Sequence, residues 1–293
     1  MDRRLTLYLP DHLRAGHEAC QTNILSRVIE ALPGWEICYR PEAEGANPAR
    51  DGFALTHMQE PRRPGVLCLR RAYWYPFWRI EPTNERWNFA VAGKLPDASH
   101  VPPRAAAFHA RLRDRVLAGR ALTREGFVFV PLQGRLTRHR SFQSMSPVAM
   151  IETLLERQPL PLRATLHPAE DYAPEDHAAL ARLARHPRFQ LVTAPAADLI
   201  AGCDFVACQN SSVALHAMVA GKGAVLFAGI DFHHPAGSVP RDGLTRALEI
   251  GQAPPQRMTE YLWWFFKQEA IDAQAPDAPG HIRAILTAQG WPE

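Results

Sequence analysis

Residues 199–227, LIAGCDFVACQNSSVALHAMVAGKGAVLF, decide the fold of this chain. Within them, residues 204–208 (DFVAC), apolar after Asp204, fit a buried strand, residues 211–220 fit a helix that ends at Gly221, and residues 224–228 fit the next strand. Neither strand alternates apolar with polar side chains, which is typical of strands that are covered on both faces. This stretch therefore predicts a strand, a helix and a second strand of one parallel sheet.

The same alternation continues towards the N-terminus of this stretch. Further strands are expected at residues 127–132, 162–166 and 189–193, and further helices at residues 147–157, 174–185 and 196–202. Ser146 is placed to cap the first of these helices, with Pro147 at its first position. Apolar strands that alternate with helices are typical of an α/β domain with a parallel sheet.

The first half of the chain repeats this pattern less regularly. Strands are expected there at residues 5–9, 35–39, 53–56 and 65–69, and helices at residues 17–32 and 105–118. After residue 240, helices are expected at residues 243–250, 256–272 and 280–288. We therefore predict an N-terminal α/β domain over residues 1–122, a C-terminal α/β domain over residues 123–242, and C-terminal helices over residues 243–293 that pack across both.

Composition excludes several classes of protein. The chain has 293 residues, with 46% hydrophobic and 22% charged, which is ordinary for a globular protein and excludes disorder, collagen and coiled coil. The formal net charge of +3 is too small to indicate nucleic-acid binding. Only three of the 33 basic residues are lysines, namely Lys94, Lys222 and Lys267. Such an arginine excess fits G+C-rich coding better than a binding surface.

The cellular setting is predicted from what the sequence lacks. None of the five cysteines forms a C-x-x-C pair, so we expect reduced thiols rather than disulfides. The N-terminal residues contain no long apolar region, and no window reaches the roughly 18 apolar residues of a membrane helix. We expect a cytoplasmic protein without a transmembrane segment, for which peripheral membrane contact is left open.

Several catalytic signatures are missing as well. The first strand is not followed by G-x-G-x-x-G, and no G-x-x-x-x-G-K-[ST], H-E-x-x-H or G-x-S-x-G occurs. The pair His233-His234 lacks a third ligand at a suitable spacing, so no metal is expected. We also expect no bound cofactor.

Three polar features follow predicted parallel strands of the second half, where open α/β sheets bind their ligands. They are Gln133, the pair His167-Pro168, and the run Asn210-Ser211-Ser212 that opens a helix. Serine at a helix start is most often an N-cap. A helix start also binds phosphate through its free N–H groups, and the two roles are compatible.

At this point the sequence resembles a known family, the bacterial capsule polysaccharide biosynthesis proteins. These include glycosyltransferases that add Kdo (3-deoxy-manno-octulosonic acid) from CMP-Kdo. The resemblance lies in the order of VFVPLQ (128–133), ATLHP (164–168) and the block 199–227, over about 110 residues. The segment RAYWYPFWRIEPTN (71–84) resembles the family more loosely.

The resemblance implies a GT-B-like architecture: two Rossmann-like α/β domains with parallel sheets, and C-terminal helices that return to the N-terminal, acceptor-side domain. It implies that the second domain binds a nucleotide-sugar, with CMP favoured, and that the acceptor is a glycan or glycolipid. His167 and the serines at the helix start would hold the phosphate. The predicted donor-binding residues are Gln133, Arg138, Pro168, Asn210, Ser211 and Ser212, and the predicted catalytic residues are His167 and Asp231.

One departure from the family leaves a second function open. Its Kdo transferases carry Gln-x-x-x-Asp, whereas this chain has Gln133-Gly-Arg-Leu-Thr137 and no Asp or Glu before Glu152. A basic cluster, Arg135, Arg138, His139 and Arg140, stands there instead. Asp231 is a substitute carboxylate, although capping of its own loop is an equally good role for it. The alternative to a glycosyltransferase is a non-catalytic GT-B-like protein that binds a glycan or a partner; an epimerase of similar fold is a weaker third reading.

Overall fold

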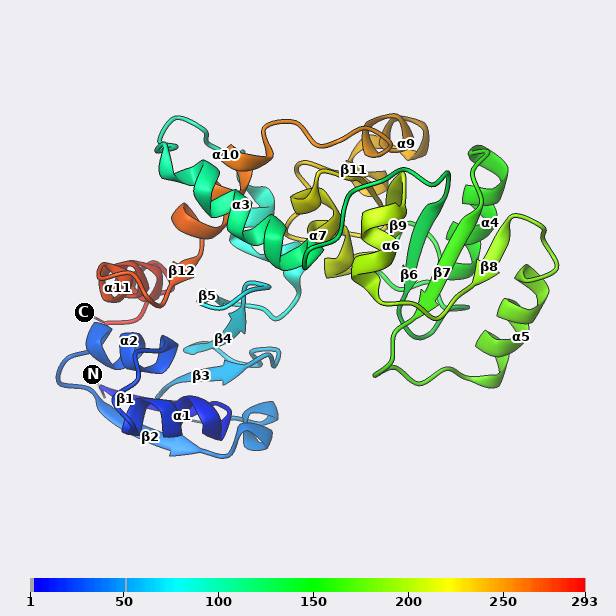
Figure 1. Ribbon diagram of the computed structural model, residues 1–293. Coiled ribbons are helices and arrows are strands. Elements are labelled where there is room, and N and C mark those ends of the chain that lie inside the picture. The colour runs from blue at the N-terminus through cyan, green and yellow to red at the C-terminus, as the bar shows by residue number, and fades with distance from the viewer. Residues whose placement is uncertain (1–2, 51, 293) are drawn as a thin grey trace. The chain divides into compact units, whose positions relative to one another are not determined.

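The computed structural model describes residues 3–50 and 52–292. The chain forms two compact units (Figure 1). The first unit comprises residues 1–95 and 264–293, and the second comprises residues 96–263. The chain therefore leaves the first unit once and comes back to it.

The second unit is built on a six-stranded parallel sheet with the order β11-β10-β9-β6-β7-β8. Its strands are β6 (Val128–Leu132), β7 (Leu162–Leu166), β8 (Phe189–Leu191), β9 (Phe205–Cys208), β10 (Gly223–Leu226) and β11 (Gly237–Ser238). Its helices are α3 (Arg104–Leu117), α4 (Pro147–Arg157), α5 (Pro174–Leu183), α6 (Ala196–Gly202), α7 (Ser212–Ala220), α8 (Val239–Asp242), α9 (Leu244–Gly251) and α10 (Met258–Trp263). This is the predicted parallel sheet, and α4, β7 and α6 have the predicted bounds.

The first unit contains a second six-stranded sheet with the order β12-β5-β4-β3-β1-β2. Its strands are β1 (Arg4–Tyr8), β2 (Glu36–Arg40), β3 (Phe53–His57), β4 (Val66–Arg71), β5 (Phe77–Glu81) and β12 (Ile271–Asp272). The first four run parallel, β5 is antiparallel to β4, and β12 is antiparallel to β5. Its α-helices are α1 (Asp11–Glu18), α2 (Ile24–Ala31) and α11 (Ala278–Ala288), with short turns η1 (Glu42–Ala46), η2 (Arg86–Asn88), η3 (Ala90–Gly93) and η4 (Trp264–Gln268).

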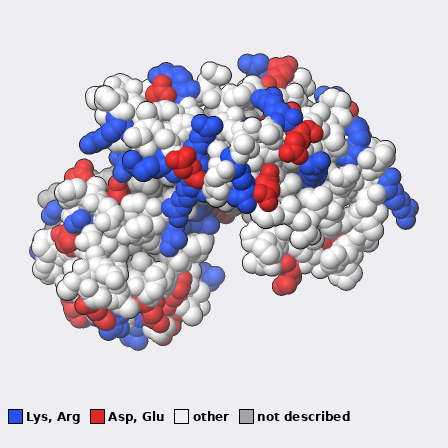
Figure 2. All heavy atoms as spheres, viewed as in Figure 1, with Lys and Arg blue, Asp and Glu red and all other residues white. Residues whose placement is uncertain are grey.

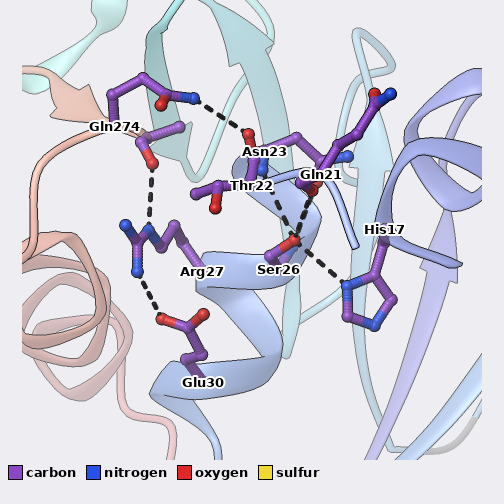
Figure 3. A network of polar contacts seen from close by, with 9 residues as sticks. His17, Gln21, Thr22, Asn23, Ser26, Arg27, Glu30 and Gln274 are labelled. Atoms are coloured by element: carbon purple, nitrogen blue, oxygen red, sulfur yellow. Dashed lines mark hydrogen bonds and ion pairs between the residues drawn. The ribbon is translucent and has the colours of Figure 1, made fainter. Parts of the chain in front are cut away.

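Hydrogen bonds attach the C-terminal residues to the first unit. The Arg27 Nε donates to the Ala273 carbonyl at 3.0 Å, and the Gln274 Nε2 donates to the Thr22 carbonyl at 2.9 Å (Figure 3). The same Gln274 nitrogen donates to the Tyr75 hydroxyl at 2.6 Å. Together with the β5–β12 pairing, these contacts confirm the predicted return of the C-terminal segment to the N-terminal domain.

The predicted single helix 17–32 is wrong, because two helices occupy this region. The chain turns at Cys20, whose φ is +58°, a value that no α-helix accommodates. Asn23 then starts α2, and its side-chain oxygen accepts from the N–H groups of Leu25 and Ser26 (2.9 and 3.1 Å). The Ser26 hydroxyl in turn contacts the ring of His17 at 3.1 Å (Figure 3).

The predicted helix 256–272 is also wrong, and three strands were missed. α10 ends at Trp263, the π-helical turn η4 follows, and the chain then becomes the edge strand β12. The missed strands are β5, whose five residues are all buried, and the two-residue strands β11 and β12. The pairing of β12 with β5 ends the helix before residue 271 and makes residues 77–81 a strand of the sheet. The two strands lie almost 200 positions apart in the sequence, so no local sequence pattern indicates that they pair.

One helical residue of the second unit links stability to pH. Desolvation, helped by the positive charge of Arg115, lowers the pKa of His216 in α7 to about 4. The unfolded chain therefore binds this proton first as the pH falls below the ordinary histidine value of about 6.5. We expect the free energy of unfolding to fall by about 2 to 3 kcal/mol from this residue between pH 6.5 and 4.

Urea unfolding across this pH range measures the effect, with His216→Gln as the variant. The variant should lose stability less steeply with falling pH than the unmodified chain. The exposed His177 provides the control, since His177→Gln should leave the slope unchanged. Equal slopes for His216→Gln and the unmodified chain would contradict the prediction.

Candidate functional site

The candidate site lies at the point where the parallel sheet of the second unit changes direction. From β6 the chain adds β7 and β8 on one side and later adds β9, β10 and β11 on the other. β6 pairs with β9 only through Val128 and Phe129, so the carboxyl ends of these neighbours are not joined by ladder bonds. Open α/β sheets bind ligands outside the strand ends at such a switch point. Gln133 follows one of these strands and Asn210 follows the other.

The start of α7 presents free hydrogen-bond donors. Ser211 is the N-cap, and its hydroxyl accepts from the Val213 N–H at 3.3 Å. The backbone N–H groups of Asn210, Ser211 and Ser212 have no hydrogen-bond partner within the described chain. The Ser212 side chain is half-buried. Because the positive end of the helix dipole lies here as well, this helix start suits an anion.

The loop between β6 and α4 lies beside this helix start. The Ser144 N–H donates to the Phe227 carbonyl at 2.8 Å, and the Gly229 N–H donates to the Phe142 carbonyl at 2.9 Å. Asn210 reaches the same segment, since its Nδ2 lies 3.5 Å from the Gly229 carbonyl oxygen. The loop and the helix start therefore form one surface.

That loop brings positive charge to the surface. Arg140 is half-buried, and burial, followed by repulsion from Arg135, lowers its pKa. Its Nε is enclosed without a hydrogen-bond partner among the described residues. Arg138 is exposed, and only its backbone is tied to the loop, by a 3.1 Å bond from its N–H to the Arg135 carbonyl. An anionic ligand would supply the hydrogen-bond acceptor that the Arg140 Nε lacks.

His167 and Pro168 follow β7 and are exposed. The Tyr172 hydroxyl ties this turn to β6, because it accepts from the His167 N–H at 2.8 Å and lies 3.5 Å from the Leu132 carbonyl oxygen. The Ala169 N–H donates to the His167 Nδ1 at 3.2 Å. In the neutral ring the proton therefore sits on Nε2, which makes this exposed nitrogen a hydrogen-bond donor.

The structure adds a carboxylate that the sequence did not indicate. A Cβ placed on Gly134 would lie only 2.6 Å from the Glu170 Oε2, so the glycine leaves room for this carboxylate directly after Gln133. Glu170 also raises the pKa of Arg140 against the larger lowering effects, so the two charges interact. The sequence signal was present, since Glu170 comes three residues after His167, but its approach to Gly134 depends on tertiary packing.

Asp231 lies in the loop after β10, two residues beyond Gly229, and it is fully buried. Its neighbour His233 has a pKa lowered by burial, although the Ile230 carbonyl, 2.8 Å from its Nδ1, opposes this. The rings of His233 and His234 stack at 4.3 Å. The catalytic role assigned to Asp231 stays a prediction.

The first unit has a cavity of its own at the carboxyl ends of β1 and β2. Its volume is about 470 Å³. Apolar side chains such as Leu7, Leu9 and Leu25 line it together with Tyr39 and the charged Arg14. The Arg14 guanidinium lies 4.8 Å from the centre of the Tyr39 ring. The cavity has a size and a mixed lining that suit a small-molecule or sugar ligand.

Two parallel-dominated sheets in one α/β chain, with a C-terminal segment that rejoins the first unit, define a GT-B-like fold. A comparison with solved structures finds the same fold in KpsC of Thermosulfurimonas dismutans, described as a beta Kdo 2,7 transferase. That match has 12% sequence identity, covers 88% of each chain and has a TM-score of 0.52. A beta Kdo 2,4 transferase KpsC of the same organism matches at 14% identity over 89% of each chain, with a TM-score of 0.49.

At these identities the likeness concerns the fold alone. No family model matches the chain, and the search of curated proteins finds no match. Among residues 3–50 and 52–292, none of the helices has the length and apolar character that crossing a membrane requires.

Proposed function

We propose that this chain is a glycosyltransferase that transfers Kdo or a related acidic sugar from a CMP-linked donor to a capsule or surface polysaccharide acceptor. The observation that carries the proposal is the grouping of anion-binding features at the switch point of the second unit. These features are the open start of α7, the loop arginines and the Nε2 of His167. The fold shared with a Kdo transferase supports the choice of sugar.

The chemistry follows from the leaving group. CMP departs as a phosphate monoester, and negative charge grows on its phosphate as the bond to the sugar breaks. The N–H groups of Ser211 and Ser212 and the Nε2 proton of His167 are donors that would stabilise this charge. Arg138 and Arg140 would add a positive potential. In this proposal the donor occupies the second unit and Gln133, Pro168 and Asn210 line its site.

The acceptor would bind to the first unit. Its cavity at the ends of β1 and β2 combines an apolar floor with arginine and carboxylate groups, as Arg14 and Glu42 illustrate. Sugars present both apolar faces and hydroxyl groups, so such a lining suits a glycan. The proposal therefore assigns donor and acceptor to different units of the chain.

Nucleotide binding provides the first test. We expect the double variant Ser211→Ala, Ser212→Ala to bind CMP at least tenfold more weakly, because it loses two hydroxyls at the phosphate. Titration calorimetry with CMP, UDP and GDP measures the affinity and selects the nucleotide. Because Ser211 also caps α7, thermal unfolding must show that the variant is folded at the assay temperature.

The exposed Ser99 supplies the control, since Ser99→Ala should bind CMP like the unmodified chain. Unchanged affinity of the double variant would exclude the two hydroxyls from the donor site and leave only the backbone N–H groups of the helix start. Absence of saturable binding for all three nucleotides and for CMP-Kdo would refute the proposal as a whole.

A non-catalytic, glycan- or partner-binding protein is the second candidate. The observation that favours it is the loop after Gln133, which holds no Asp or Glu before Glu152. Nucleotide binding without any turnover of CMP-Kdo, together with retention of a glycan or protein partner in a pull-down, would favour this candidate. Turnover of CMP-Kdo would exclude the non-catalytic candidate. The carboxylate that the Gln-x-x-x-Asp pattern supplies in the family would then come from Asp231 or Glu170.

A further inference from the structure

The helix α3 carries a surface of arginines that the proposed transfer reaction does not use. Its exposed members, called here the α3 arginine surface, are Arg104, Arg111, Arg113 and Arg115. The stretch 104–124 contains six arginines and a single acidic residue, Asp114. Figure 2 shows Lys and Arg side chains gathered along the region where α3 runs in Figure 1.

Some arginines on other helices pair with carboxylates close by in sequence. Arg14 pairs with Glu18 on α1, and Arg246 pairs with Glu249 on α9. None of the four arginines of the α3 surface has an ion pair within the described chain. Arg104 lies over the Trp263 ring instead, at 5.3 Å from its centre. The positive charge of this surface is therefore not compensated locally.

The spacing along α3 makes this arrangement unfavourable in the free protein. Arg111 and Arg115 are four residues apart, so they lie on the same side of the helix, where like charges destabilise it. Phe108, Leu112 and Val116 are buried and hold α3 against the rest of the second unit. An anionic partner would relieve the repulsion while the buried face keeps the helix in place.

We propose that the α3 arginine surface docks the protein on a membrane that contains anionic phospholipids. A helix that exposes charged side chains along its outer side can meet many headgroups of a flat bilayer at once. Recognition of an acidic sugar chain instead calls for a concave site with aromatic and hydroxyl partners, whereas the exposed side chains of α3 are the four arginines, three alanines and Asp114. Basic residues are attracted to an anionic bilayer, and salt limits the distance over which this attraction acts.

Sedimentation with vesicles tests this surface in the full chain. We expect binding to vesicles of phosphatidylcholine and phosphatidylglycerol in a 7:3 ratio, and none to pure phosphatidylcholine. Binding should weaken when NaCl rises from 0.1 to 0.5 M. In the triple variant Arg111→Gln, Arg113→Gln, Arg115→Gln it should fall about 100-fold, since each arginine contributes roughly fivefold.

The matched control removes three exposed arginines from other parts of the chain that also have no ion pair among the described residues, namely Arg157→Gln, Arg185→Gln and Arg283→Gln. It has the same net charge as the α3 variant and should keep most of the binding. Equal losses in both variants would show that only total charge matters and would overturn the proposal, as would no binding to either vesicle. Titration with CMP in the same samples keeps this result separate from the proposed function, because vesicle binding does not depend on nucleotide binding.

Discussion

His167→Ala should lower the rate of transfer from CMP-Kdo by about 100- to 1,000-fold while the chain remains folded, because one preorganised donor to the leaving phosphate is lost. The structure gives the reason for choosing this residue. The Ala169 N–H fixes the tautomer by donating to Nδ1, and the Tyr172 hydroxyl fixes the backbone by accepting from the His167 N–H. The exposed Nε2–H is thus preorganised as a donor. Single-turnover kinetics with CMP-Kdo measure the effect.

The comparison of His167→Ala with His167→Gln sharpens this test. Gln keeps an N–H donor at a similar reach, so it should recover part of the lost rate, whereas a structural role would leave both variants alike. The exposed His100, which lies outside this site, provides a neutral control through His100→Ala. Transfer rates that are unchanged in His167→Ala would exclude His167 from the reaction.

The same assay separates the two carboxylates near the site. If Asp231 takes part in the chemistry, Asp231→Asn should lose turnover and keep its affinity for CMP. Glu170→Gln should do so instead if the carboxylate beside Gly134 replaces the missing acid of the Gln-x-x-x-Asp pattern. Full activity of both variants would show that neither carboxylate is required.

Lys222→Met should destabilise the protein by about 3 to 5 kcal/mol, the largest stability effect that we expect from one substitution. Lys222 is buried, and its ammonium donates to the carbonyl of Cys203 at 2.6 Å and to the carbonyl of Thr123. Met fills a similar volume without any N–H, so both buried carbonyl groups lose a charged donor. Urea unfolding of the full chain measures the change.

Lys94→Met is the matched control, because Lys94 pairs with Glu269 at the surface, where an ion pair contributes less than about 1 kcal/mol. A loss of less than 1 kcal/mol in Lys222→Met would mean that water replaces the ammonium at these carbonyls. The result bears on the pair Gly221-Lys222, which directly follows α7. It gives this pair a structural role, since the lysine joins the end of α6 to the segment that enters β6.

The sequence predicted the second unit well because its strands are short apolar runs separated by helices of clear period. Ser146 and Ser211 cap the helices as expected. The first unit was predicted less well. The break at Cys20 rests on a left-handed backbone conformation, and β5 needs its partner β12 from the far end of the chain. No local pattern carries either feature.

The candidate site shows the same limit. The polar residues at strand ends were found from strand order alone, because parallel strands bring their carboxyl ends to one edge. The donor character of the His167 Nε2 and the approach of Glu170 to Gly134 depend on turns whose geometry the sequence does not reveal. From the sequence alone, the arginine excess is attributed to G+C-rich coding. The structure shows that four of these arginines are exposed on the single helix α3.

The return of the chain to the first unit has a consequence for biosynthesis. Residues 96–263 form the second unit without a break, so this unit can fold while the ribosome is still at work. The first unit must wait, since β12 and α11 supply its sheet edge and cover α2 only after residues 271–288 have been made. Until then β5 has an unpaired edge, and such edges can pair with strands of other chains, so we expect this half of the protein to be the more prone to aggregation during synthesis.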